Sequence, residues 1–155
     1  MSFELCKAAL RSTIEAIAPT RAARYGFVCI QTEDAGRQSR LEDLKSGTRY
    51  FEIVASSTPL EAGEGIRPCR WTVDLLIRVR YDYTYDHDPA DSMIVEDAIS
   101  IIKAIRKPSN WDQSNTGMRS LIAESPADPI ILGDDDDRPS ALIFPFPVTI
   151  TFKDC

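Results

Sequence analysis

Four consecutive aspartates in the segment GDDDDR form the sequence's most concentrated group of potential ligands. Carboxylate oxygens are the ligands that Mg²⁺ and Ca²⁺ prefer, so a cation site is one interpretation. Calcium loops, however, alternate their ligands so that the chain can wrap around the ion, whereas four adjacent side chains diverge. Two other interpretations stay open: a solvated acidic turn between strands, and an electrostatic contact with a basic partner. The spacing therefore predicts no specific metal site at Asp134, Asp135, Asp136 and Asp137.

The only histidine, His87, lies between Asp86 and Asp88, and a histidine beside carboxylates can act as a general base or a metal ligand. No partner nucleophile stands near it in the sequence. A polar connection between a strand and a helix, with Asp88 as the helix cap, explains the segment without chemistry. We therefore expect no catalytic role for His87.

Short catalytic and nucleotide-binding motifs are missing from the sequence, which contains no GxSxG, Walker A, GxGxxG or HExxH pattern. The four cysteines, Cys6, Cys29, Cys69 and Cys155, are far apart and form no CxxC pair, a pattern that does not suit a zinc site. Reduced structural thiols are the expected state in a cytosolic chain. The sequence thus predicts that the protein is not an enzyme and holds no metal or cofactor.

Composition narrows the class of protein further. The 24 acidic and 18 basic residues give a formal net charge of -6, which argues against broad nucleic-acid binding and against an anionic membrane surface. No apolar window is long enough for a membrane-spanning helix, and the amphipathic N-terminus lacks the apolar core of a secretory signal. We expect one domain, residues 1–155, that is made in a cytoplasm.

Apolar periodicity predicts two helices and at least four strands. The helices are expected at residues 3–18 and 86–108, and the strands at 25–32, 49–57, 69–83 and 140–152, with a further strand possible at 118–124. In the second helix the predicted buried stripe consists of Ile94, Val95, Ala98, Ile101, Ile102 and Ile105. This order indicates an α+β fold, in which two helices pack on one face of a mostly antiparallel mixed sheet of about four to five strands.

Two expectations concern the strands themselves. Pro145 and Pro147 cannot donate to a strand ladder, so part of the last strand should lie at an edge or a bulge. Along residues 69–83 one face is apolar, whereas the other carries charges and should be solvated or should face a partner. The polar loop 33–49 also carries charges of both signs, and such surfaces suit protein partners or ordinary surface salt bridges. The candidate partner-interface residues are Arg37, Arg40, Lys45, Arg78, Arg80, Asp134, Asp135, Asp136 and Asp137.

The order of these segments resembles a known family, the tail terminator (tail completion) proteins of long-tailed bacteriophages of the phage lambda type. An amphipathic N-terminal helix opens the chain, and a central strand beginning with a tryptophan, WTVDLLIRVRYDY, leads through DPADS into the second helix. The Asp-rich GDDDDR then precedes a final alternating strand, ALIFPFPVTITF. The two prolines of that strand and the segment 111–132 depart from the family pattern.

The resemblance implies a structural virion protein without catalysis or a cofactor. About six copies would form a hexameric ring at the head-proximal end of the tail tube, where the ring ends tube polymerisation and joins the neck. The implied partners are further copies of the chain, the tail tube protein and a neck or head-completion protein, and the implied location is the virion tail at the neck junction. The four aspartates would lie at the rim or lumen, and the loop 33–49 would reach the tube or neck. Another head–tail connector or minor tail protein, and a small enzyme with an unrecognised site, remain the alternatives.

Overall fold

A computed structural model gives the arrangement of the chain. The structure describes residues 3–18, 26–30, 49–61, 70–82, 88–107, 116–118, 129–132 and 141–153. Within these ranges the elements are α1 (Phe3–Glu15), β1 (Phe27–Cys29), β2 (Arg49–Ala55), β3 (Leu60–Glu61), β4 (Arg70–Asp82), α2 (Asp88–Arg106), β5 (Thr116–Met118), β6 (Ile130–Leu132) and β7 (Ala141–Lys153).

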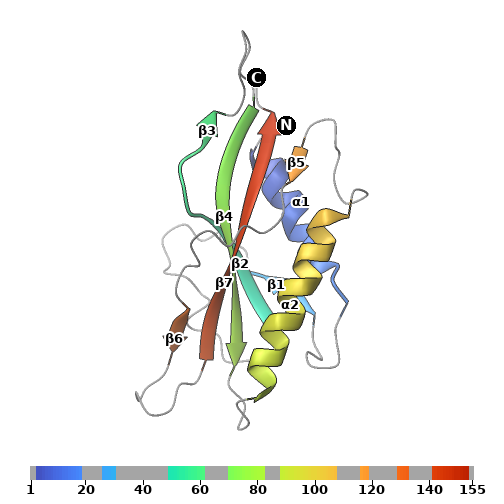
Figure 1. The fold of residues 1–155 in the computed structure, drawn as a ribbon, viewed down its shortest axis with the longest axis vertical. Coiled ribbons are helices and arrows are strands. Elements are labelled where there is room, and N and C mark those ends of the chain that lie inside the picture. Colours follow the sequence, from blue (N-terminus) through green and yellow to red (C-terminus); the bar gives the residue numbers. More distant parts are fainter. Residues whose placement is uncertain are drawn as a thin grey trace.

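The sheet is built around β4 and β7, two antiparallel strands that pair along their whole length, from Arg70 opposite Lys153 to Asp82 opposite Ala141 (Figure 1). The strand order is β1-β2-β4-β7-β5, and two short strands are added, β3 beside β4 and β6 beside β7. Only β1 and β2 are parallel, and the other described pairs are antiparallel. The predicted α+β fold with a mostly antiparallel mixed sheet is confirmed.

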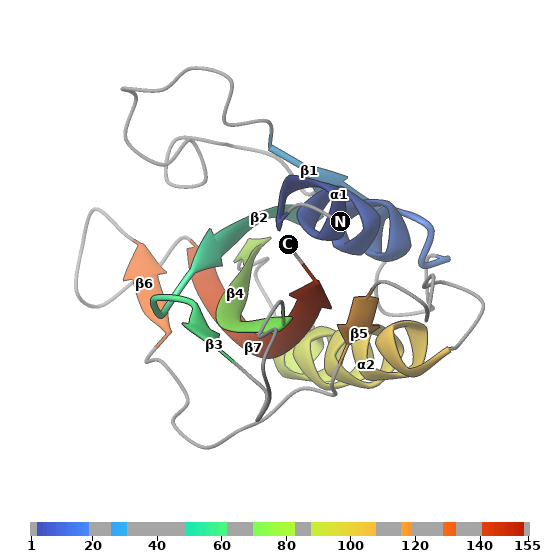
Figure 2. The same ribbon diagram turned by 90° about the horizontal axis from the view of Figure 1, so that it is seen from above.

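Both helices cover the same face of this sheet. Alternate residues of β4, among them Leu75 and Ile77, are fully buried in one core cluster with Leu10 of α1 and Ile101 of α2. Seen from above, α1 and α2 lie on the same side of the curved β4–β7 pair (Figure 2). Burial of this apolar surface is the main favourable contribution to the fold.

Helix α1 buries one stripe, because Cys6, Leu10 and Ile14 follow one another at four-residue spacing. The helix ends at Glu15, three residues before the predicted end. Beyond it the amide of Ile17 donates to the carbonyl of Ile14 at 3.1 Å, the shorter-range bond of a tightened last turn. The sequence also places Pro19 next, and a proline disfavours helical geometry in the residue before it.

The two prolines of β7 lie in its middle, opposite Arg78 and Leu76 of β4. On the other side of β7, β6 pairs with residues 141–143 and β5 with residues 150–152, so no described strand pairs with residues 144–149. Because Pro145 and Pro147 are two residues apart, their nitrogens take the same orientation in the ladder and can both face this unpaired side. Within the described strands, the two prolines thus lie in a stretch of β7 that is paired with β4 alone.

Some strand boundaries differ from the sequence prediction. The strand expected at 25–32 is limited to Phe27–Cys29, and of the strand considered at 118–124 only Met118 lies in β5, the rest falling outside the described residues. The strands β3 and β6 were not predicted, since two or three residues are too few to show an alternating pattern.

Matched leucines in α1 test the position of the core. Leu10 is 0% exposed and Leu5 is 57% exposed, within the same helix. We expect Leu10→Ala to lower the free energy of unfolding by about 2–5 kcal/mol, because it removes buried methyl groups and leaves a cavity. Leu5→Ala should change it by no more than about 0.5 kcal/mol. Urea denaturation measures both, and equal losses would contradict the placement of α1.

Candidate functional site

A buried polar cluster joins α2 to the sheet. The Asp97 side chain is 0% exposed, and its Oδ1 accepts a charge-assisted hydrogen bond from Nη1 of Arg49 on β2. Its Oδ2 accepts a hydrogen bond of 2.7 Å from the hydroxyl of Tyr81 on β4. Both carboxylate oxygens are therefore bound, each from a different strand.

An aromatic ring also contacts Arg49. The guanidinium carbon lies 4.0 Å from the centre of the Phe27 ring, which is the geometry of a cation–π contact. The Phe27 ring in turn meets the ring of Phe51 edge to face, with their centres 6.0 Å apart. The buried positive charge is thus balanced by Asp97 and held against an aromatic face.

Burial dominates the electrostatics of this cluster. It raises the pKa of Asp97, an effect that the hydrogen bond from Tyr81 and the charge of Arg49 partly oppose. Burial and the neighbouring Asp97 carboxylate also raise the pKa of Tyr81 well above 10. Tyr81 therefore keeps its proton and serves as a donor. With its acceptors and donors satisfied internally, the cluster is suited to holding α2 in place.

The back of the sheet, turned away from the helices, differs in part from the expected charged and exposed surface. Arg78 forms an ion pair with Glu52 across β2 and β4 at 2.8 Å, and both side chains are largely buried. Arg80 is only 6% exposed, so the expectation of an exposed side chain is wrong at this position. Asp74 is exposed, as expected, and accepts a 2.7 Å hydrogen bond from Thr149. This cross-strand ion pair accounts for the position of Arg78 within one copy of the chain, and the role of Arg78 at an interface stays a prediction.

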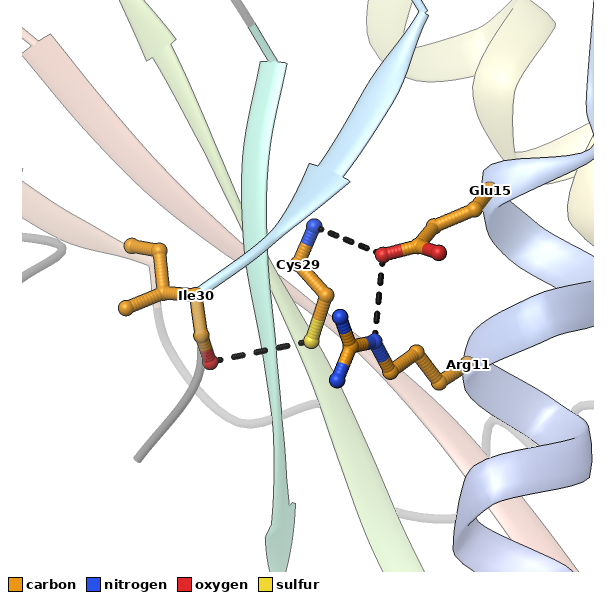
Figure 3. A network of polar contacts seen from close by, with 4 residues as sticks. All are labelled: Arg11, Glu15, Cys29 and Ile30. Carbon is orange, nitrogen blue, oxygen red and sulfur yellow. Dashed lines mark hydrogen bonds and ion pairs between the residues drawn. The ribbon is translucent and has the colours of Figure 1, made fainter. Parts of the chain in front are cut away.

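Helix α1 is tied to the edge strand β1 by a second polar network (Figure 3). The Oε1 atom of Glu15 accepts from Nε of Arg11 at 3.1 Å and from the amide of Cys29 at 3.3 Å. The next amide, that of Ile30, donates to Phe51 of β2, so the amide of Cys29 points to the opposite side of the strand. Glu15 thus accepts a hydrogen bond from a backbone amide that would otherwise be unpaired at the edge of the sheet.

The described thiols are not set up as nucleophiles. Burial raises the pKa of Cys6, and burial is also the main cause of the raised pKa of Cys29. Thiols with raised pKa values remain protonated at neutral pH and react slowly.

Within the described ranges, no group of three or more His, Cys, Asp or Glu could hold a metal ion. No helix in that part of the chain is long and apolar enough to cross a membrane.

Most of the residues predicted to meet a partner lie outside the described residues. These are Arg37, Arg40, Lys45, Asp134, Asp135, Asp136 and Asp137, and the candidate His87 lies there too. Of the predicted interface set, the structure therefore places only Arg78 and Arg80.

Exposed apolar side chains mark a surface that the sequence analysis missed. On α2, Val95 is 59% exposed and Ile99 is 47% exposed, so the prediction that Val95 belongs to the buried stripe is wrong. The reason is Asp97, whose side chain occupies a core-facing position. Residues two positions away on a helix point about 200° round its axis, and this places both Val95 and Ile99 opposite Asp97. A polar residue in the core-facing stripe would have been the signal for this rotation.

We call Val95, Ile99 and Lys103 the outer α2 surface, since all three are exposed and follow one another at four-residue spacing. A second exposed apolar residue, Leu60, lies with Glu61 in β3, and we call this pair the β3 edge. Exposed apolar residues that gather on one surface commonly mark protein contacts.

Comparison with known proteins adds no family to this description. A scan against protein-family models finds no match, and a search of curated proteins finds none either.

Removal of the Asp97 carboxylate tests the buried cluster. We expect Asp97→Ala to cost about 3–5 kcal/mol of stability, because it leaves the Arg49 charge buried without its partner. Asp74→Ala is the matched control, an exposed aspartate on the same sheet, and should cost no more than about 1.5 kcal/mol. Chemical denaturation measures the difference, and a similar loss for both variants would contradict the structural role of Asp97.

The raised pKa of Tyr81 predicts a loss of stability in alkali. Above pH 10 an unfolded tyrosine releases its proton, whereas the folded Tyr81 retains it. The folded state then binds more protons than the unfolded state, so stability falls as the pH rises from 10. Tyr81→Phe should be less stable than the wild type at pH 8 but should lose less stability between pH 10 and 11. Parallel pH profiles for the two proteins would show that Tyr81 titrates normally.

Proposed function

We propose that the chain is a structural virion protein of the tail-terminator kind. About six copies would form a ring at the head-proximal end of the phage tail tube, end its polymerisation and provide the joint to the neck. The same copies would be made in the host cytoplasm and would act in the finished virion without a cofactor.

The observation that carries the proposal is the arrangement of the segments on which the resemblance rests. The amphipathic helix at the N-terminus is α1, the strand containing Trp71 is β4, the segment DPADS opens α2, and the final alternating strand is β7. These four elements form the two long paired strands and both helices that cover them. A fold alone does not determine a function, so the surfaces must support the proposal independently.

The surfaces support an assembling protein in two ways. Two buried polar clusters among the described residues serve the fold, since Asp97 binds Arg49 and Tyr81, and Glu52 binds Arg78. Large apolar side chains are exposed on α2 and on β3, where a neighbouring protein could cover them. The exposed valine and isoleucine of α2 are removed from water only when another surface covers them. This burial would stabilise the complex between the two surfaces.

Growth of the tail tube is the direct test. Cognate tail tube subunits should polymerise without limit alone, and addition of this protein should give shorter tubes that carry extra density at one end in electron micrographs. Tubes of unchanged length, with no protein bound at either end, would contradict the proposed function. Binding to the portal side of the neck alone would favour a different head–tail connector.

The four consecutive aspartates give a prediction for the joining step. Replacement of Asp134 to Asp137 by lysines should impair the joining of tails to heads while the circular dichroism spectrum and the unfolding midpoint stay unchanged, since a run of acidic side chains would act by charge complementarity. The matched asparagine variant keeps the size of the side chains and removes only the charge. Unfolding of the lysine variant would show instead that the aspartates are needed for the fold.

A further inference from the structure

We propose that copies of the chain meet head to tail, with the outer α2 surface of one copy packed against the β3 edge of the next. The inference rests on the proposed function, because a ring requires an interface between copies, and it names the two surfaces that form this interface. The occupant of each surface is thus a second copy of the same chain.

The outer α2 surface offers a helical ridge for such a contact. Val95 and Ile99 are one helical turn apart and exposed, and Lys103 follows one turn later. Arg106 at the end of the helix is also exposed. Every charged side chain that is described as exposed on α2 is therefore basic, and all of these charges lie in its last turn.

The β3 edge offers a complementary surface. Leu60 is 67% exposed, the highest value among the described large apolar residues, and Glu61 beside it is exposed as well. The exposed Asp74 lies nearby, since Leu60 pairs with Thr72, two residues away from it on β4. Among the described strands β3 pairs only with β4, so no described strand lies against its other edge. An apolar side chain flanked by acids matches a ridge of apolar side chains followed by bases.

The positions of the two surfaces favour a head-to-tail contact. Both views place β3 and α2 on opposite sides of the long β4–β7 pair (Figures 1 and 2). When two copies meet through different surfaces, the pair still has one unoccupied outer α2 surface and one unoccupied β3 edge. A third copy can therefore add, and the row of copies can close into a ring. Pairing of α2 with α2 would instead stop at a dimer, and among the side chains described as exposed on α2 it would bring only basic charges together.

The test uses two single variants, Ile99→Asp and Leu60→Asp, which each place a charge in one of the two surfaces. Each variant alone should lose the assembly and appear as a monomer in native mass spectrometry. When the two are mixed, with one of them isotope-labelled, the intact α2 of Leu60→Asp can bind the intact β3 of Ile99→Asp. The mixture should therefore give a dimer that contains one copy of each variant, and no larger species.

Controls separate this result from loss of the fold. The circular dichroism spectrum and unfolding midpoint should be unchanged in both variants, and formation of the mixed dimer itself requires folded chains. Leu5→Asp places the same charge at an exposed leucine of α1 outside both surfaces and should leave the assembly intact.

The remaining outcomes overturn the proposal in distinguishable ways. If the wild type assembles and both variants still do, the interface lies elsewhere while the proposed function stands. If Leu60→Asp assembles and Ile99→Asp does not, α2 pairs with itself or with another surface and the head-to-tail contact is wrong. If the wild type remains monomeric in solution and on tail tubes, both the interface and the proposed ring fail.

Discussion

The carboxylate of Asp97 receives a hydrogen bond from Arg49 on β2 and another from Tyr81 on β4, and this contact determines how α2 lies on the sheet. A buried charge is costly unless it is paired and fully hydrogen-bonded, so the helix cannot rotate without exposing or orphaning these groups. The packing of Ile101 and Ile105 in the core follows from the same rotation. The interaction contributes a specific orientation more than net stability, since desolvation of the three groups opposes their attraction.

The orientation that Asp97 gives to α2 also determines which residues of the helix are exposed. With Asp97 facing the sheet, Val95 and Ile99 face away from it, and the basic end of the helix continues the line that they form. On the opposite side of the long strand pair, β3 presents an apolar residue beside an acid, and no described strand pairs with its outer edge. The buried cluster thus links the core to the surfaces that we propose as the contact between copies. At β1 the effect is the opposite. Glu15 accepts a hydrogen bond from a backbone amide at the edge of the sheet, and this makes pairing of a further strand with β1 less favourable.

Much of the fold follows from periodicity in the sequence. The alternation along β4 and β7 correctly indicates two long strands, and the two helices are also predicted correctly. Periodicity failed where polar groups enter the core. Val95 was assigned to the buried stripe because the apolar residues of α2 exceed one face, and Arg80 was expected to be exposed because it is charged. For α2 the decisive contact joins Arg49 and Asp97, which are far apart in the sequence, and one-dimensional patterns do not contain such pairings.

The central claim is that the chain is built to assemble with copies of itself, and the mass of the wild-type assembly tests it most directly. Native mass spectrometry of the purified protein over a wide range of concentrations should show one closed species of about six copies with few intermediates, because ring closure removes the free ends of an open chain of copies. Addition of tail tubes should increase this species if closure requires the tube. A monomer under all of these conditions, or an open series of ever larger masses, would contradict the account.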